Sequence, residues 1–479
     1  MVGSGTMTLA ELARAVDGRR VSGRAETRID RFSIDSRSLR PGDFFVAIRG
    51  DRLDGHTFVL EALARGARGA IVSDEAALGS LSENGVVVDD TLRALQSLAR
   101  YIRRGSDAQV VAITGSVGKT GTKEMLRLTL SAFGSVHASA RSYNNAIGVP
   151  LTLANLPKET DYAVVEIGMN HGGEIATLSE LSRPDVAVVT TVAAVHLGNF
   201  NSIDDIASAK AEIFVGVESG GVAVLNRDNP FFRQLRSAAE IGVEQIIGFG
   251  CATDANIRLI KYDASPGCNT LTVEIEGHPI VYQLGADGLH WACNSLAVLG
   301  VIHGFGENPR AAVGCLADFQ GMQGRGVRHS INLGDGEIEL IDDSYNANPV
   351  SMCAALEVLG TSRPKHSGRR IAVLGDMLEL GSGEGAFHAK LADNVAAANV
   401  DLTFTVGNRM LHLRDALSSV RRGGHAEFAS QIITPVIFAL GRGDVVLVKG
   451  SHGSGMSGVV DALLQASDGP DMAIVDNSN

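Results

Sequence analysis

The apolar positions of the chain form short runs whose spacing changes along the sequence. From residue 107, continuous Val, Ala and Ile runs alternate with helical stretches: QVVAITG (109–115), DYAVVEIG (161–168), PDVAVVTTV (184–192) and GVAVLN (221–226). Runs of this kind are typical of parallel strands that are buried on both faces. This part of the chain is therefore predicted to form a parallel sheet covered by helices.

Two flanking regions show other patterns. Before residue 107, the strand-like runs RFSIDS, GDFFVAIRG and GAIVSD surround a predicted helix at 58–65 and are separated by turn signals. Residues 256–284 alternate apolar and polar positions, which predicts antiparallel strands, either as a hairpin insertion or as a flank of the parallel sheet. Helices are predicted to follow at 291–303 and 309–318.

The pattern changes again near GMQGRGVRH. Beyond it, the runs IELIDDS, RRIAVLGDM, LTFTVGN and DVVLVKGS alternate with helical stretches and predict a second α/β unit. We therefore predict an α/β protein of three domains, spanning 1–106, 107–326 and 327–479. Ligands bind at the carboxyl ends of strands in such units, and a crevice between the two α/β units is the expected site.

Composition narrows the class of protein. A chain of 479 residues is too long for one ordinary core, and 45% apolar with 20% charged residues is typical of a soluble globular protein. The net charge of −12 argues against nonspecific nucleic-acid binding, and no apolar run is long enough for a membrane span. The five cysteines have no paired spacing, which predicts a cytoplasmic protein with buried thiols.

The clearest chemical signal is the run VVAITGSVGKTGTKEML (110–126), a strand that leads into a glycine-rich turn and a helix. Glycines allow backbone N–H groups to approach phosphates, while Lys119 could reach the terminal phosphates and Thr120 could bind Mg²⁺. Ile113 stands where the general phosphate loop has its first glycine. A glycine-rich turn with an exposed lysine is the structural alternative.

Three further residues fall where this architecture places ligands. Glu166 ends an apolar strand and His196 follows the next strand, so both are predicted at the same sheet edge. Lys210 shares a helix face with Ile206 and Phe214, which predicts that it is buried and needs a partner or a modification. A lone edge charge, a structural histidine and a snorkelling lysine are the alternatives.

Together these motifs resemble a known family. TGSVGKT, VVEIGMN, VAAVHLGNF, SAKAEIF, CNSLA, GRG and DDSYNANPVSM occur in one order, which resembles the ATP-dependent Mur ligases of peptidoglycan synthesis. The resemblance implies a UDP-sugar-binding first domain, a central P-loop-type ATPase domain and a Rossmann-like C-terminal domain. It also accounts for Ile113, because this family uses the shortened loop.

Within the family, SYNNAIGVPLTL (142–153), DSYNANPVSM (343–352) and GDMLELG (375–381) resemble the members that join D-alanyl-D-alanine to UDP-N-acetylmuramoyl-tripeptide. The implied substrates are ATP and these two compounds. We also expect the protein to be a monomer. The alternative within the family adds a single amino acid, such as diaminopimelate. A P-loop switch and a scaffold protein are alternatives from other classes.

The resemblance also implies roles for individual residues. The ATP phosphates would be held by Gly115, Ser116, Val117, Gly118, Lys119, Thr120 and Gly121. Two Mg²⁺ ions would be bound by Thr120, Glu166, His196 and a carbamylated Lys210. Asn294 would lie near adenine, Arg325 near the interdomain hinge with its flanking glycines, and Asp343 near ribose.

The remaining implied residues would bind the other substrates. Ser36, Asn144 and Asn145 would face the UDP-muramoyl substrate, and Asn346, Asn348 and Lys449 would lie near the dipeptide or ATP. The chain departs from the common family pattern at Val117, Trp291, His452 and Ser457.

Overall fold

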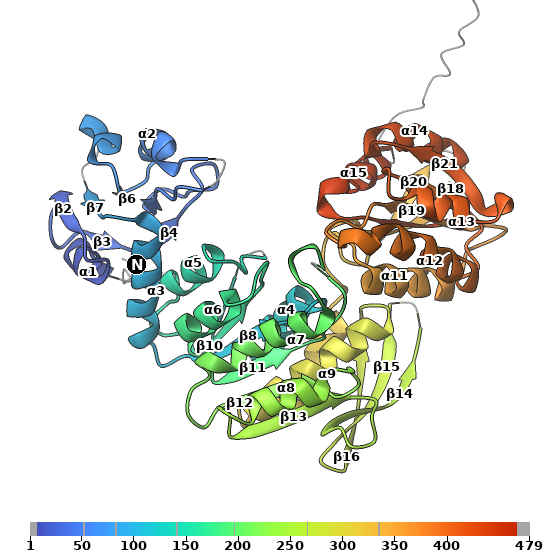
Figure 1. Ribbon diagram of the computed structural model, residues 1–479, viewed down its shortest axis with the longest axis horizontal. Coiled ribbons are helices and arrows are strands. Elements are labelled where there is room, and N and C mark those ends of the chain that lie inside the picture. Colours follow the sequence, from blue (N-terminus) through green and yellow to red (C-terminus); the bar gives the residue numbers. More distant parts are fainter. Residues whose placement is uncertain are drawn as a thin grey trace, which may run out of the picture.

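A computed structural model describes residues 7–50, 53–81, 84–139, 142–195, 197–265, 267–333 and 336–466. Its three main sheets belong to three α/β bodies that follow one another along the chain. The bodies form an arc, with the first and third at its two ends and the second between them (Figure 1).

The first body contains a five-stranded sheet of short strands. Its order is β2 (Arg19–Ser22), β7 (Gly85–Val87), β6 (Gly69–Val72), β5 (Phe44–Val46) and β4 (Phe32–Ser33). The helices include α1 (Leu9–Ala15), α2 (Val59–Ala64) and α3 (Thr91–Arg104).

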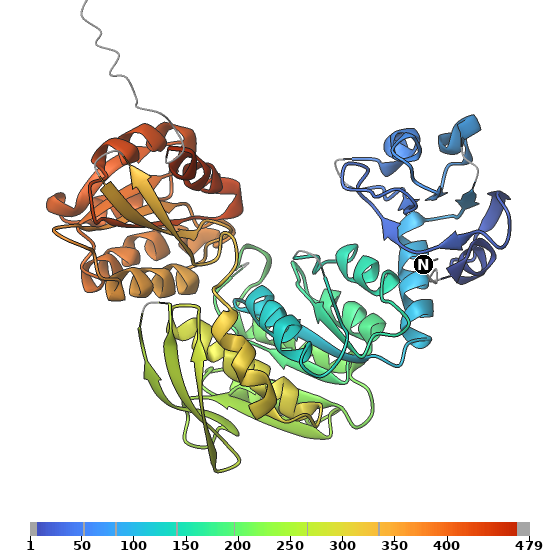
Figure 2. The same ribbon diagram turned by 180° about the vertical axis from the view of Figure 1, so that it is seen from behind.

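Helix α3 joins the first body to the second. Asp90 caps its first turn by accepting hydrogen bonds from two backbone N–H groups. At its other end, Arg103 donates to the carbonyl oxygens of Ser182 and Arg183, each at 2.8 Å. Figure 2 shows α3 running from the first sheet down to the second body. A buried arginine thus fixes the junction.

The second body has a nine-stranded sheet. The parallel part runs in the order β13 (Gln245–Gly250), β12 (Val222–Asn226), β11 (Val186–Val189), β8 (Gln109–Thr114), β10 (Tyr162–Glu166) and β9 (Val136–Ala138). After β8 the chain first builds β9 and β10 on one side and then β11 and β12 on the other. The direction of building therefore reverses at β8, which creates a crevice at its carboxyl end.

Residues 256–284 extend this sheet rather than forming a separate hairpin. Strand β14 (Ile257–Asp263) pairs in parallel with β13, and β15 (Asn269–Ile275) and β16 (His278–Leu284) continue it in antiparallel fashion. The prediction of antiparallel strands is confirmed, and the flank is the arrangement found.

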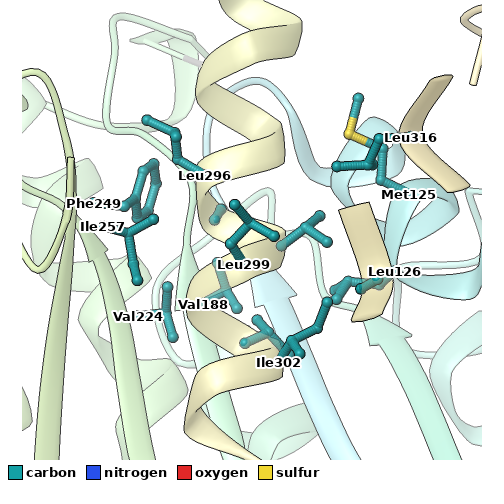
Figure 3. Packing of buried hydrophobic residues seen from close by; sticks show 14 of the residues in the cluster. Met125, Leu126, Val188, Val224, Phe249, Ile257, Leu296, Leu299, Ile302 and Leu316 are labelled. Carbon is teal, nitrogen blue, oxygen red and sulfur yellow. The ribbon is translucent and has the colours of Figure 1, made fainter. Parts of the chain in front are cut away.

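Two helical layers cover the central sheet. One face packs on α4 (Lys119–Leu130) and α9 (Leu289–Gly304), which lie side by side in Figure 2. The other packs on α5 (Gly148–Ala154), α6 (Glu174–Ser182), α7 (Ile203–Ala211) and α8 (Phe232–Ala239). Figure 3 shows Leu296, Leu299 and Ile302 of α9 against Val188, Val224, Phe249 and Ile257 of the sheet.

The third body is built on a six-stranded sheet. Its order is β17 (Val327–Leu333), β18 (Gly336–Asp343), β22 (Val445–Lys449), β19 (Arg370–Gly375), β20 (Leu402–Val406) and β21 (Arg422–Ala426). Only β17 is antiparallel to its neighbour. The helices are α11 (Pro349–Thr361), α12 (Glu384–Ala397) and α13 (Leu411–Ala416) on one face, with α14 (Ala429–Ala439) and α15 (Ser457–Ala466) on the other.

The structure confirms the predicted α/β class and its three-domain organisation, whereas the boundaries at 106 and 326 remain predictions. The helix predicted at 309–318 is only partly α-helical, since α10 (Pro309–Ala312) passes into a 3-10 helix at Val313–Asp318. Cys251 and Cys268 are exposed, so the prediction of buried thiols is wrong for them. No helix among the described residues is long and apolar enough to cross a membrane.

Leu299→Ala should destabilise the central domain. Its side chain is fully buried between α9 and the sheet, so truncation loses apolar burial and leaves a cavity. We expect a loss of about 2–5 kcal/mol in the free energy of unfolding, measured by urea denaturation. Val281→Ala on the exposed face of β16 is the control and should change it by less than about 0.5 kcal/mol. Equal effects of the two variants would contradict this packing.

Candidate active site

The turn between β8 and α4 requires glycine at two positions. Gly115 has a φ of 147° and Gly118 a φ of 90°, which residues with a Cβ rarely adopt. A Cβ on Gly118 would lie 2.6 Å from Oδ1 of Asn294, and one on Gly115 would lie 1.9 Å from Oγ1 of Thr190. The turn is thus packed directly against neighbouring side chains, which keeps its backbone fixed at the helix N-terminus.

Lys119 begins α4 and folds back over this turn. Its Nζ donates a hydrogen bond to the carbonyl oxygen of Gly115 at 2.7 Å. Burial lowers the pKa of Lys119, and the nearby Arg325 lowers it further while Glu166 opposes the shift. A cation beside a glycine turn and a helix N-terminus is suited to bind a polyphosphate.

Glu166 lies at the carboxyl end of β10 and is only 1% exposed. Its Oε1 accepts hydrogen bonds from Oγ1 of Thr120 at 3.2 Å and from Nδ2 of Asn144 at 2.8 Å. Its Oε2 is buried and has no hydrogen-bond partner among the described residues. An unsatisfied buried carboxylate oxygen is unfavourable, so the site is suited to a cation that this oxygen could bind.

The donor chemistry around Glu166 fits Mg²⁺. Carboxylate and hydroxyl oxygens are the ligands this ion prefers, and it keeps several waters and substrate phosphates in its shell. The described residues contain no group of three or more His, Cys, Asp and Glu side chains that could hold a metal.

Lys210 lies near the end of α7, whose N-cap is Ser202, and is only 2% exposed. The predicted burial with Ile206 is therefore confirmed. Burial and the charge of Lys119 lower the pKa of Lys210 well below its ordinary value. Its Nζ forms no hydrogen bond or ion pair with the described part of the chain. The predicted need for a partner or a modification therefore stands.

The opposite wall of the site comes from the carboxyl ends of β18 and β22. Nζ of Lys449 lies 2.8 Å from Oδ2 of Asp343 and donates to the carbonyl oxygen of Asn346 at 2.9 Å. The guanidinium of Arg325 lies over the ring of Tyr345, 4.2 Å from its centroid. This wall therefore presents a fixed set of charges and one aromatic ring.

One cleft of about 510 Å³ brings both walls together. The predicted site residues that line it are Gly115, Ser116, Val117, Gly118, Lys119, Thr120, Gly121, Asn144, Asn145, Glu166, Lys210, Asn294, Arg325, Asp343, Asn346, Asn348 and Lys449. Residues more than three hundred positions apart thus face a common space.

Two predicted residues are not placed in this cleft. Ser36 is buried in the first body and is not among the lining residues, and His196 lies outside the described residues. Two others also have local structural tasks: Oδ1 of Asn348 caps α11 through the N–H of Ser351, and Oδ1 of Asn145 accepts from the N–H of Gly148. Their side chains are thus partly occupied before any substrate binds.

Sequence analysis missed several lining residues. Trp291 was noted only as a departure from the family pattern. A Cβ added to Gly121 would lie 2.3 Å from the ring of Trp291, so this ring packs directly against the phosphate loop. Tyr345 stacks on Arg325 and also lies 5.8 Å from the ring of His452. The position of Tyr345 directly after a predicted strand was the one available signal.

The fold and the cleft define a class of protein: a nucleotide-using enzyme with a P-loop-type domain that faces a Rossmann-like domain. Comparison with known sequences agrees and is more specific. Three family models match the chain. Residues 28–103 match the model described as Mur ligase family, catalytic domain. Residues 113–302 match the Mur ligase middle domain, and residues 328–452 match the model described as Mur ligase, glutamate ligase domain. The chain belongs to the Mur ligase family.

Individual relatives match over nearly the whole chain. The UDP-N-acetylmuramoyl-tripeptide–D-alanyl-D-alanine ligase of Escherichia coli (strain K12) is 35% identical over 461 residues, which cover 96% of this chain and 98% of the relative. A crystal structure of MurF from Acinetobacter baumannii superposes with a TM-score of 0.84 at 30% identity, covering 96% of this chain and 98% of that one.

Two further structures bear on the ligand and on the alternative. MurF ligase from Thermotoga maritima in complex with ADP has a TM-score of 0.77 at 27% identity and covers 91% of this chain and 98% of its own. A UDP-N-acetylmuramoyl-L-alanyl-D-glutamate–2,6-diaminopimelate ligase covers 97% and 100%, but its TM-score is 0.51 at 17% identity. The latter shares the fold alone.

Gly118→Ala should weaken nucleotide binding. The new Cβ would meet Oδ1 of Asn294 at 2.6 Å in a backbone conformation that disfavours it. The control is Gly173→Ala, which has a similar φ of 86° but no atom within 4 Å of the new Cβ. Both variants should lose about 1 kcal/mol of stability from backbone strain.

Calorimetric titration with ADP separates the two effects. Only Gly118→Ala should weaken ADP binding, by roughly tenfold or more, since each 1.4 kcal/mol of lost contact is a factor of ten. Normal ADP affinity in Gly118→Ala would show that the turn is not the phosphate site.

Proposed function

We propose that this protein joins the amine of D-alanyl-D-alanine to the terminal carboxylate of UDP-N-acetylmuramoyl-tripeptide, with ATP as the energy source. The products are UDP-N-acetylmuramoyl-pentapeptide, ADP and phosphate, in peptidoglycan precursor synthesis. The observation that carries the proposal is the cleft, in which the phosphate loop and the unsatisfied oxygen of Glu166 face Asp343 and Lys449 of the third body. Full-length similarity to ligases of this name supports it.

The chemistry explains why such a cleft is needed. A carboxylate is a poor electrophile at neutral pH, so it must first attack the γ-phosphate of ATP and form an acyl phosphate. Both reactants are anions, and Lys119 lies where it would offset their repulsion and stabilise the charge of the transferred group. The fixed backbone of the turn would orient the phosphates without reorganisation.

In the second step, the amine attacks the acyl carbon and phosphate leaves. An acyl phosphate would hydrolyse in open water, so the reaction must be enclosed. The third body supplies one wall of the cleft, and its approach to the central body would exclude water and deliver the amine. Both walls are therefore required for turnover.

We further propose that Thr120, Glu166, His196 and Lys210 hold Mg²⁺. The unsatisfied Oε2 of Glu166 and the hydroxyl of Thr120 support this for one ion. Bound Mg²⁺ would neutralise phosphate charge and act as a Lewis acid. Lys210 as an ammonium could not serve, because it is a cation itself.

Carbamylation of Lys210 by CO₂ would resolve this conflict. The amine nitrogen would form a bond to the carbon of CO₂ and release one proton, which turns a buried cation into an oxygen ligand. The full burial of Lys210 and the absence of a hydrogen-bonding partner in the described part of the chain support the modification. The substrates are cytoplasmic precursors, so we also propose a cytoplasmic enzyme.

The alternative of a single-amino-acid ligase is less well supported, because the ligase of that type shares only the fold. A nucleotide switch is also disfavoured, since it would need neither the third-body wall nor a buried Lys210. Amine specificity distinguishes the two ligases directly.

Phosphate release should require ATP, UDP-N-acetylmuramoyl-tripeptide and D-alanyl-D-alanine together. The acyl phosphate forms only on the bound carboxylate and is consumed only by the amine. The assay omits each compound in turn and identifies the pentapeptide by mass spectrometry. Turnover with diaminopimelate or L-lysine in place of the dipeptide would instead support the alternative ligase, and release from ATP alone would indicate an ATPase.

Lys210→Ala should lower the turnover number by roughly 10²–10³-fold, the loss typical of a removed charge-stabilising group. Acetate or another short carboxylic acid should restore part of the activity, because its carboxylate would replace the lost carbamate. The exposed Lys158→Ala is the control and should behave like the unsubstituted enzyme. An active Lys210→Ala, or equal stimulation of both variants by acetate, would argue against a carbamate.

A further inference from the structure

The short helix α5 (Gly148–Ala154) lies between the first body and the cleft, and the function proposed above gives it no task. Asn144 and Asn145 precede its first turn and line the cleft. Asn155 ends the helix at the side of the first body. Figure 1 shows α5 next to α3, between the first body and the central sheet. Its seven residues span about 10 Å, so its two ends reach different parts of the molecule.

The two faces of α5 are buried in different cores. Val149 and Leu153 belong to the hydrophobic core of the central body, whereas Leu151 and Ala154 pack in the core of the first body. Residues three or four positions apart share a face of a helix, so each pair forms one apolar face. The helix is therefore a wedge that both bodies hold by buried side chains.

The side chain of Asn155 pairs with β4 (Phe32–Ser33), the edge strand of the first sheet. Its Oδ1 accepts a hydrogen bond from the N–H of Phe32 at 2.8 Å, and its Nδ2 donates to the carbonyl oxygen of Phe32 at 3.1 Å. The same Nδ2 donates to the carbonyl oxygen of Leu151 in α5 at 2.9 Å. An edge strand presents N–H and C=O groups that no neighbouring strand satisfies. One amide group thus satisfies part of this edge and attaches it to the end of α5.

Strand β4 leads directly to the residue predicted to face the UDP-muramoyl substrate. The hydroxyl of Ser33 accepts from the N–H of Asp35 at 3.3 Å and donates to its carbonyl oxygen at 3.2 Å, and the buried Ser36 follows this turn. A continuous series of contacts therefore runs from Asn144 in the cleft, through α5 and Asn155, to Ser36 in the first body.

The proposed substrate is long and has to bind at both ends of this series. Its UDP group is expected in the first body at Ser36, while its reacting carboxylate must reach the phosphates beside Lys119 in the cleft. A ligand that binds two sites at once gains affinity only if the sites are held at the matching separation. An error of about 1 Å in the placement of a reacting group costs on the order of 10²-fold in rate.

We propose that Asn155 is a positioning residue, which holds the first body at the distance from the cleft that UDP-N-acetylmuramoyl-tripeptide spans. The inference rests on the proposed function and adds the residue that matches the protein to the length of this substrate. Arg103 already attaches α3 to the central body. A single attachment allows the first body to rotate about it, whereas a second attachment on a different element prevents the rotation.

Calorimetric titration of Asn155→Leu tests the proposal. Leucine has a similar volume but forms neither hydrogen bond to Phe32. The Kd of UDP-N-acetylmuramoyl-tripeptide should rise about 10- to 100-fold, because the two sites are no longer held at a fixed separation. The Kd of UDP, which reaches only the first body, should stay the same, as should that of ADP. Asn332→Leu makes the same change on an exposed residue of β17 and should alter none of the three values.

Steady-state kinetics give a second readout. In Asn155→Leu, the kcat/KM for UDP-N-acetylmuramoyl-tripeptide should fall on the order of 10²-fold, while the KM for D-alanyl-D-alanine should not change. The titrations need no turnover, so they separate this inference from the proposed function. An unsubstituted protein that shows the expected binding but ligates no amine would refute the proposed function. An unsubstituted protein that binds UDP-N-acetylmuramoyl-tripeptide no more tightly than UDP would refute the positioning role.

Asn155→Asp distinguishes positioning from a general loss of stability. Aspartate has the same shape and keeps an acceptor for the N–H of Phe32, but it loses the donor to the two carbonyl oxygens. Urea denaturation identifies which of the two variants is folded, and each folded variant should bind UDP normally and the full substrate weakly. Equal weakening of UDP and UDP-N-acetylmuramoyl-tripeptide in a folded variant would overturn the proposal, as would unchanged affinity for both.

Discussion

Three charges enclosed at the carboxyl edge of the central sheet constrain the rest of the molecule. Lys210 is buried and Lys119 is half-buried, and burial together with the charge of Lys119 lowers the pKa of Lys210. Glu166 lines the same cleft, and its buried Oε2 accepts no hydrogen bond from the described residues. Charges removed from water without partners are unfavourable. The protein tolerates this arrangement because polyphosphate and a divalent cation would supply the missing partners, so the ligands complete an electrostatic site that the fold leaves unfinished.

The same topological device appears twice and explains how distant residues meet. In the central sheet, building reverses at β8, which leaves the phosphate loop between the ends of β10 and β11. In the third sheet, β22 is inserted between β18 and β19, which brings Lys449 next to Asp343. Each reversal opens a crevice at the carboxyl ends of the strands. Because these two edges face each other, one cleft is lined by the glycine turn and Lys119 of the central body and by Asp343 and Lys449 of the third body.

Local patterns predicted the parts of this site that depend on local physics. Apolar runs predicted the parallel strands, the glycine spacing predicted the turn before Lys119, and the helical spacing of Ile206 and Lys210 predicted the burial of the lysine. Sheet order, the packing of Trp291 against the phosphate loop and the pairing of Asn155 with Phe32 depend on contacts between distant segments, which no single pattern encodes. The exposure of Cys251 was mispredicted for a related reason, since burial is decided by neighbours.

The connection between the two bodies can be analysed further. Gly324 and Gly326 were predicted to flank a hinge at Arg325, but both are hydrogen-bonded to Asp342. The N–H of Gly324 donates to Oδ2 of Asp342 at 2.8 Å, and the N–H of Gly326 donates to the carbonyl oxygen of Asp342 at 2.7 Å. Asp342 belongs to β18 and is buried, so these bonds attach the segment firmly to the third body. The stacking of Arg325 on Tyr345 adds to the same attachment. If the third body turns, Arg325 therefore turns with it, and the pivot lies before Gly324. Closure of the third body onto the central body would then carry the Arg325 guanidinium toward the phosphates, and Arg325 itself would not be the point of rotation.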